Sequence, residues 1–217
     1  TCAAAILDGA GIPIDFSDRA KSEAIRIDRA GITDDDLKDR LDLRDEVIFT
    51  IDGEFAKDLD DAISIEKDGD GYKLGVHIAD ISHYVKKGSA IDEEAYERGT
   101  SIYYANKVVP MLPKELSNGI CSLNPNEDRL CFSALIDLNT DGKIISHKFE
   151  KTVIRSRIKG IYSEINSILD GKASDEIRQK YADVLDKISL MNELADILHK
   201  NKRMRGAPQL DSVEGLL

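Results

Sequence analysis

Two long strand-like runs joined by a short polar turn constrain the fold of this chain more than any other feature. The first run is RLCFSALIDL at 129–138, the second is IISHKFEKTVI at 144–154, and the turn NTDG lies at 139–142. Runs rich in β-branched and aromatic residues favour strands, and Asn, Asp and Gly adopt the backbone angles of tight turns. The pattern predicts a long hairpin, so the fold must contain an antiparallel sheet.

Three further runs predict more strands. They are VIFTI at 47–51, AISIE at 62–66 and YKLGVHIAD at 72–80, with the turn KDGDG at 67–71 between the last two. TSIYYANKVVPMLP at 100–113 is predicted to be extended, because each of its prolines disfavours the α region for the residue before it.

Helices are predicted on both sides of these strands. They are expected at 15–28 with Ser17 as N-cap, from Thr33 in TDDDLKDR, at 91–99 ending at Gly99, at 163–171, and over 174–202. The acids after Thr33 occupy a first turn, where the helix dipole favours them. The expected fold class is α+β (mixed α/β), a largely antiparallel sheet flanked by helices.

Ten residues between two predicted strands carry a high density of acid. The stretch DGEFAKDLDD at 52–61 holds four aspartates, one glutamate and a single lysine. Two carboxylates about 4 Å apart repel by roughly 1 kcal/mol in water and by roughly 4 kcal/mol at an effective dielectric of about 20. A solvated loop avoids this cost by keeping its acids apart, whereas a site that needs them together must supply a cation.

The spacing of these acids allows a metal site. Asp52 directly follows one strand, and three more acids precede the next: Asp58, Asp60 and Asp61. A tight excursion between neighbouring strands would fold the first acid against the others. Carboxylates without a nearby His or Cys suit a hard cation such as Mg²⁺ or Mn²⁺. Two such ions about 4 Å apart can activate water and stabilise the leaving oxygen of a phosphodiester displacement. A solvated acidic loop explains the spacing equally well.

The charge balance by itself argues against a nucleic-acid binder. The net charge is −11 and the isoelectric point is about 4.9, whereas nucleic-acid binders are usually basic. The acids gather at 34–39, 52–61 and 92–97, and the strip KFEKTVIRSRIK at 148–159 is locally basic. Because local fields decide binding, an acidic pocket with a basic strip is still compatible with a nucleic-acid substrate.

Three features bear on the cellular compartment. No run of about 18 apolar residues is present, so no membrane span is predicted. Cys2, Cys121 and Cys131 are odd in number and lack metal-site spacing, which favours free thiols in a reducing compartment. The start TCAAAILDGAGIPIDF has neither an initiator Met nor the basic segment of a secretory signal, which suggests an internal piece of a longer product. A cytoplasmic protein is expected.

Two turns imitate calcium-binding loops. The segments that begin at Asp137 and Glu66 place acidic or amide residues at alternate positions and then a Gly, as an EF-hand loop does. The twelfth position of such a loop should be a bidentate Glu, but it is Lys148 in the first segment and His77 in the second. Strand-like alternation flanks both segments, so hairpin turns are expected rather than calcium sites.

The acid-rich stretch belongs to a longer recognisable pattern. TIDGEFAKDLDDAISIE resembles the active-site signature of the RNB-type exoribonucleases, the ribonuclease II / ribonuclease R family. The likeness continues through GVHIADISHYV, through RGTSIYYANKVVPMLPKELSNGICSLNPNEDRLCFSALIDL and through FEKTVIRSRIKG. RGTSIY and SNGICSLNP are closer to the ribonuclease R branch. The resemblance covers most of residues 40–205.

The resemblance implies a function and a set of site residues. The family degrades single-stranded RNA processively from its 3′ end by hydrolysis and releases nucleoside 5′-monophosphates with Mg²⁺, for which Mn²⁺ is a possible substitute. Its four active-site aspartates fall on Asp52, Asp58, Asp60 and Asp61. Asp52 and Asp61 are then the expected direct metal ligands, and Asp58 helps to complete the cluster. Asp60 is the acid whose loss should harm chemistry more than RNA binding.

Tyr103 falls where the family places an aromatic side chain that stacks on a base near the 3′ end. Stacking is worth about 1–3 kcal/mol per base and tolerates any sequence. Alternation along a strand puts Tyr103 and Tyr104 on opposite faces, so one of them stacks and the other packs. The resemblance favours Tyr103 for stacking.

Other polar residues have weaker claims. Asp80 follows a strand and is either an acid behind the metal ligands or a structural cap; His77 and His83 fit core or surface roles better than ligation. Three arginines, and the strip 148–159 as a whole, are candidates for phosphate contacts, with ordinary salt bridges as the alternative: Arg129, Arg155 and Arg157.

The predicted organisation is incomplete relative to the family. Residues 1–40 are expected to form a helical lead-in, and 41–217 the N-terminal portion of an RNB catalytic domain truncated at its C-terminus. The OB-fold RNA-binding domains of the family are not visible, and its later half-site, with an arginine and a second aromatic, has no counterpart here. The segment PQLDSVE after the RGA motif departs from the family. The alternative function is a catalytically incomplete fragment that acts only as a metal-binding or RNA/protein interaction module.

Overall fold

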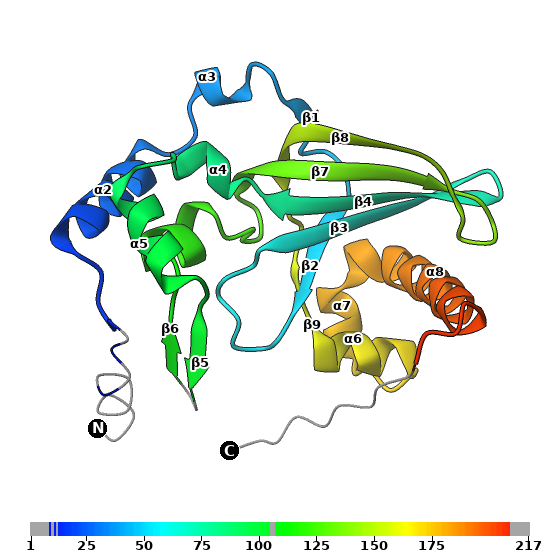
Figure 1. The fold of residues 1–217 in the computed structure, drawn as a ribbon. Helices are drawn as coiled ribbons and strands as arrows, with labels where there is room; N and C mark the ends of the chain where they lie inside the picture. The colour runs from blue at the N-terminus through cyan, green and yellow to red at the C-terminus, as the bar shows by residue number, and fades with distance from the viewer. Residues whose placement is uncertain (1–8, 10, 12, 105–106, 209–217) are drawn as a thin grey trace.

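A seven-stranded sheet forms the centre of the molecule in the computed structural model, which describes residues 9, 11, 13–104 and 107–208 (Figure 1). Its strand order is β1-β8-β7-β4-β3-β2-β9. The strands are β1 (Leu41–Leu43), β2 (Ile48–Asp52), β3 (Asp61–Asp68), β4 (Gly71–Ala79), β7 (Asp128–Leu138), β8 (Ile144–Arg155) and β9 (Lys159–Ile161). The central pairs are antiparallel, while β1 and β9 join the edges in parallel with β8 and β2. The expected mixed fold with a largely antiparallel sheet is confirmed.

The predicted long hairpin is confirmed as β7 and β8. Its turn is closed by Asn139, whose Oδ1 accepts hydrogen bonds from the backbone N–H groups of Asp141 at 3.1 Å and Lys143 at 2.8 Å. Gly142 adopts a positive φ of 70°, which a residue with a side chain rarely does. This calcium-like segment therefore directs its amide oxygen to the turn's own backbone.

A layer of helices covers one face of the sheet beside β2, β3 and β4 (Figure 1). It consists of α6 (Tyr162–Leu169), α7 (Asp175–Lys180), the 3-10 helix η2 (Ala182–Val184) and α8 (Leu185–Met204). The helical run expected over 174–202 is present, but it is divided into α7, η2 and α8. The chain breaks at Tyr181, which is fully buried and whose hydroxyl accepts from Ile161 N–H at 3.0 Å and donates to Glu164 at 2.6 Å. The burial of Tyr181 and its two hydrogen bonds favour a break in the helix at this position.

The other helices lie beside the other end of the strands (Figure 1). They are α2 (Asp18–Ala30), α4 (Ile81–Tyr84), α5 (Ala90–Arg98) and the π-helix η1 (Glu115–Ile120); α3 (Asp34–Leu37) lies above them in Figure 1. Ser17 caps α2 by accepting from Ala20 N–H at 3.2 Å, and Gly99 ends α5 in the left-handed region, as predicted. A separate two-stranded sheet pairs β5 (Ile102–Tyr104) with β6 (Lys107–Val109). No helix among the described residues is long and apolar enough to cross a bilayer.

Cys121 and Cys131 are buried in the protein core as free thiols. Burial raises the pKa of Cys121 to about 12 and raises that of Cys131 as well, so both are protonated and unreactive near neutral pH. The free-thiol prediction is confirmed for these two, and Cys2 lies outside the described residues.

Candidate active site

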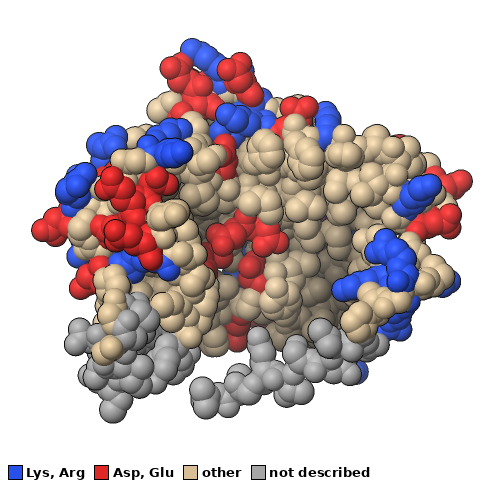
Figure 2. Space-filling model, in the orientation of Figure 1, with Lys and Arg blue, Asp and Glu red and all other residues tan. Residues whose placement is uncertain are grey.

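The four aspartates named from the sequence lie at one end of the β2–β3 pair. Asp52 is the last residue of β2, Asp61 is the first of β3, and Asp58 and Asp60 lie in the connection between them. Figure 2 shows acidic side chains gathered in the middle of one face, over the place where Figure 1 draws this connection. The predicted excursion between neighbouring strands therefore brings the acids to one edge.

Leu59 determines how the two loop acids point. Its side chain is 1% exposed and packs with Ile48, Ala62 and Leu123 in the core beneath the loop. Adjacent side chains of an extended segment point in opposite directions, so burying Leu59 turns Asp58 and Asp60 outward. The apolar residue inside the acidic motif thus orients the acids beside it.

Ser122 holds the same loop from the protein interior. Its buried hydroxyl accepts a hydrogen bond from Leu59 N–H at 3.1 Å and donates to Lys57 O at 2.8 Å. Backbone bonds from Leu123 N–H to Leu59 O at 2.8 Å and from Ala79 N–H to Asp60 O at 2.9 Å complete the attachment. Sequence reasoning missed Ser122, although it lies within the SNGICSLNP motif.

Tyr103 faces the acids from the small β5–β6 sheet. Its hydroxyl donates to Asp58 Oδ2 at 3.1 Å, and its side chain is 68% exposed. Asp58, Asp60 and Tyr103 line one cleft of about 300 Å³, whose remaining wall is largely apolar: Ile78, Ala79, Ile81, Ser101, Met111, Leu112 and Ser117. Asp52 and Asp61 do not line this cleft. The aromatic face and two carboxylates therefore share one cavity, with the other two acids beside it.

Mutual repulsion and desolvation perturb the acids. Partial desolvation raises the pKa of Asp60, and the charges of Asp58, Asp61 and Asp52 add to the rise. Desolvation likewise raises the pKa of Asp52, with contributions from Asp61 and Asp58. The negative charges of neighbouring aspartates therefore disfavour ionisation of both Asp52 and Asp60. A bound cation would offset this repulsion and stabilise the cluster.

The donor set fits a hard divalent cation in chemistry. All four side chains offer only oxygen, which suits Mg²⁺ or Mn²⁺. Among the residues that the structure describes, Asp52 Oδ2 is a buried acceptor without a hydrogen-bond partner. Within the described residues, no three His, Cys, Asp or Glu side chains form a preformed metal cage. The four aspartates therefore supply suitable oxygen ligands for a cation, but they do not form a preassembled metal site.

A family assignment follows from comparison with known proteins. A profile of the RNB domain matches residues 40–217. The chain belongs to the RNB family. This RNB chain is 48% identical to ribonuclease R of Thermotoga maritima over 196 residues, which are 90% of the chain and 27% of that protein. It is 41% identical to ribonuclease R of Escherichia coli over 176 residues, 81% of the chain and 21% of that protein.

The fold of the RNB chain matches solved structures as well. Mycoplasma genitalium ribonuclease R in complex with ribose-methylated single-stranded RNA superposes with a TM-score of 0.88 at 31% identity, over 97% of this chain and 32% of that chain. The same protein in complex with double-stranded RNA gives a TM-score of 0.85 at 32% identity, over 94% of this chain and 35% of that chain. The RNB chain thus spans about a third of these proteins or less.

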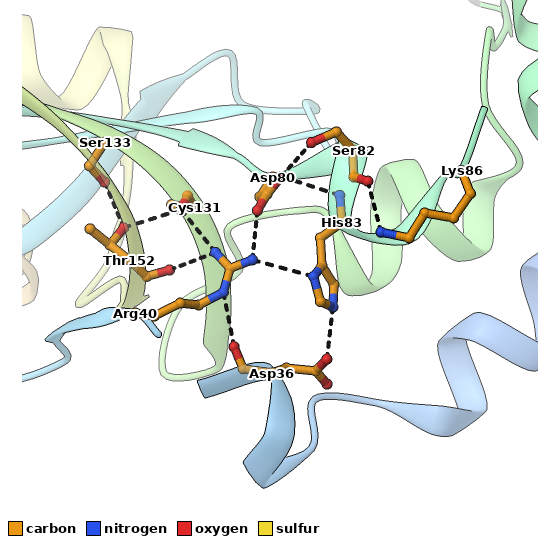
Figure 3. Close-up of polar contacts among 9 residues, drawn as sticks. All are labelled: Asp36, Arg40, Asp80, Ser82, His83, Lys86, Cys131, Ser133 and Thr152. Atoms are coloured by element: carbon orange, nitrogen blue, oxygen red, sulfur yellow. Dashed lines mark hydrogen bonds and ion pairs between the residues drawn. The ribbon is translucent and has the colours of Figure 1, made fainter. Parts of the chain in front are cut away.

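Asp80 of the RNB chain has a structural role. It caps α4 by accepting from His83 N–H at 3.2 Å and from the Ser82 hydroxyl at 2.8 Å. Its other oxygen accepts from Arg40 at 2.6 Å, as Figure 3 shows. His83 lies against the same guanidinium and contacts Asp36 at 2.9 Å. Of the two roles left open for Asp80, the cap is therefore the one observed.

His77 lies in the middle of the RNB sheet. It is fully buried, with Nδ1 2.8 Å from Ser133 Oγ and Nε2 3.1 Å from Ser64 Oγ. A Cβ at Gly75 would lie 2.6 Å from His77 Nε2, so glycine makes room for the ring. These contacts are the core role expected for His77.

The three arginines of the RNB chain considered for phosphate binding form hydrogen bonds or ion pairs within the protein. Arg129 donates to Ser122 O at 2.6 Å and Arg155 pairs with Asp128 at 2.7 Å. Arg157 donates to Asp45 O at 2.8 Å. The expected salt bridges are therefore present for Arg155 and, with Glu127, for Arg129, whereas Arg157 donates to backbone carbonyls.

Proposed function

We propose that this chain carries the metal-binding half of the active site of a processive 3′-to-5′ exoribonuclease that hydrolyses single-stranded RNA and releases nucleoside 5′-monophosphates. The observation that carries the proposal is the shared cleft, in which Tyr103 lies against Asp58 and Asp60. Membership of the RNB family and likeness to ribonuclease R support the reaction class. OB-type RNA-binding domains in the parent chain and a cytoplasmic location belong to the same proposal.

The proposed roles of the side chains follow from their positions in the site. Tyr103 presents an exposed ring on which a base can stack without regard to its identity. Asp58 and Asp60 face the cleft that would receive the phosphate next to that base. Asp52 and Asp61 stand at the strand ends beside them as the main candidate ligands.

The proposed cofactor is Mg²⁺, with Mn²⁺ as a substitute, held by Asp52 and Asp61 with Asp58 completing the cluster. When bound, the cation would activate water and stabilise the leaving oxygen of an in-line displacement. Asp60 is the acid proposed to act on chemistry more than on RNA binding. Leu59 and Ser122 keep the acids in place through the loop contacts described above.

The test is a 5′-labelled single-stranded RNA incubated with the 217-residue chain and Mg²⁺ or Mn²⁺, beside Asp60→Asn. The substitution keeps the shape of the side chain and removes its charge. Asp70→Asn, in the exposed β3–β4 turn, is the matched control. A ladder that shortens from the 3′ end in the wild type and in the control, but not in Asp60→Asn, is the expected result.

The alternative function is a catalytically incomplete fragment that acts only as a metal-binding or RNA/protein interaction module. The chain spans 27% of the Thermotoga relative, so this alternative is tested beside the first. No ladder in any variant, together with retained Mn²⁺ binding, would exclude activity of this chain and favour the alternative. A ladder from the full-length parent under the same conditions would then still support the function of the parent.

A further inference from the structure

One cation reaches the acidic loop from a distant part of the chain. Lys159 is half-buried, and its Nζ donates to Glu54 O at 2.9 Å and to Ala56 O at 2.6 Å. A bond from Ala56 N–H to Gly53 O at 3.1 Å closes the turn between them. This turn directly follows Asp52, so the ammonium group holds the segment that leads from the first acid to the others.

The backbone of Lys159 is held on both sides. On one side, β9 runs parallel to β2, with Lys159 opposite Thr50 and Ile161 opposite Asp52. A Cβ at Gly160 would lie 2.6 Å from Thr50 O, so only glycine allows this close approach. On the other side, the buried Tyr181 hydroxyl accepts from Ile161 N–H at 3.0 Å. The break between α7 and α8 thus anchors the strand that presents Lys159.

Lys159 also provides positive charge beside Asp52, whose Oδ2 is buried and has no hydrogen-bond partner within the described part of the chain. Its charge acts against the desolvation and the neighbouring aspartates that raise the pKa of Asp52. Lys57 carries the same charge in the same loop, but its side chain is exposed. Comparing the two lysines therefore distinguishes the effect of positive charge near the acids from the effect of the hydrogen bonds that Lys159 makes to the loop.

We propose that Lys159 is a positioning residue of the acidic site, which fixes the turn at 53–56 and thereby holds Asp52 in register with Asp58, Asp60 and Asp61 for a divalent cation. The inference rests on the proposed function, because it assigns Lys159 to the same site. Removing the two hydrogen bonds should loosen the ligand set, whereas removing a positive charge alone should favour cation binding. The two effects have opposite signs.

The experiment measures Mn²⁺ affinity by isothermal titration calorimetry for the wild-type chain, Lys159→Met, Lys159→Arg and the control Lys57→Met. Lys159→Met should bind Mn²⁺ about 10-fold to 100-fold more weakly, the range typical for residues that orient metal ligands. Lys159→Arg, which keeps charge and donors, should restore most of the affinity. Lys57→Met should bind as the wild type does or slightly more tightly.

Unchanged or tighter Mn²⁺ binding by Lys159→Met would overturn the inference, because charge alone would then explain the effect. If Lys159→Met does not fold, Lys159→Gln replaces it, because its side chain lacks the charge and places its donor nitrogen one atom short of the Lys159 ammonium. Weaker Mn²⁺ binding by Lys159→Gln would support the inference, and unchanged or tighter binding would overturn it. The RNA ladder separates the two proposals. A wild type that binds Mn²⁺ and degrades RNA beside an equally active Lys159→Met would overturn this inference alone, whereas a wild type that binds no Mn²⁺ would overturn both.

Discussion

Arg40 and Asp80 form an ion pair at 2.6 Å in which the two side chains are only 3% and 5% exposed. The guanidinium also donates to Cys131 O at 3.1 Å, to Thr152 O at 3.3 Å and to Asp36 O at 3.0 Å, so one side chain joins α3 to β7 and β8 (Figure 3). Arg40→Met leaves Asp80 as a buried charge without its partner. We expect it to lower the free energy of unfolding by about 3–5 kcal/mol, measured by urea denaturation.

The control for Arg40 is a pair on the surface. Lys38 pairs with Asp35 on α3, and both side chains are well exposed. Exposed pairs contribute about 0–1 kcal/mol, so Lys38→Met should change the free energy of unfolding by no more than that. Equal effects of the two substitutions would show that burial of the Arg40–Asp80 pair does not matter.

Acid should destabilise the protein partly through His77. Burial lowers the pKa of His77 to about 4, whereas an unfolded histidine has a pKa of about 6.5. Between these values the unfolded chain binds a proton at His77 that the folded chain does not, so stability is present above pH ~6.5 and is lost as pH falls toward ~4. The shift corresponds to about 3 kcal/mol.

His77→Gln tests this pH dependence because Gln does not titrate. The free energy of unfolding of wild type and variant should be measured from about pH 7 to about pH 4, the window of the His77 shift. Contributions of the carboxylates cancel in the difference between the two curves. A difference that stays constant over this window would contradict a depressed pKa at His77.

Loss of the Ser122 hydroxyl should loosen the aspartate loop. Ser122→Ala leaves the buried Leu59 N–H and Lys57 O without their partner, which should cost about 1–3 kcal/mol of unfolding free energy. Because the bond to Leu59 lies between Asp58 and Asp60, we also expect weaker Mn²⁺ binding, measured by calorimetry. Ser189→Ala on α8, at an exposed position, should change neither quantity. Normal Mn²⁺ binding in Ser122→Ala would show that the loop holds its shape without this hydroxyl.

Two substitutions at Tyr103 distinguish the contribution of its aromatic ring from that of its hydroxyl group. Tyr103→Phe removes the hydrogen bond to Asp58 and keeps the stacking surface, so RNA affinity should be retained. Tyr103→Ala should lose about 1–3 kcal/mol of RNA binding, measured by fluorescence anisotropy in an Asp60→Asn background so that the RNA is not degraded. Tyr96→Ala, 88% exposed on α5, is the control. If Phe and Ala at position 103 weaken binding equally, the hydroxyl and not the ring contacts the RNA.

Local patterns were sufficient for the elements whose signals lie within a few residues. The β7–β8 hairpin follows from its alternation and its Asn-to-Gly turn, α2 from the Ser17 cap, and the end of α5 from Gly99. β9 has only three residues and lies in a basic stretch, so it carries no strand pattern of its own. It exists because β2 offers a free edge that Gly160 can approach.

The sequence by itself determined the sheet-forming hairpins, the acid cluster between β2 and β3, and the family resemblance carried by that cluster, because each depends on residues close together in the chain. Only the tertiary structure decided which groups support the cluster. Ser122 and Lys159 reach the loop from positions about 60 and 100 residues away, with separations of 63 for Ser122–Leu59 and 103 for Lys159–Ala56. Packing, and not chain proximity, brings these donors to the loop, and no local pattern encodes such a contact.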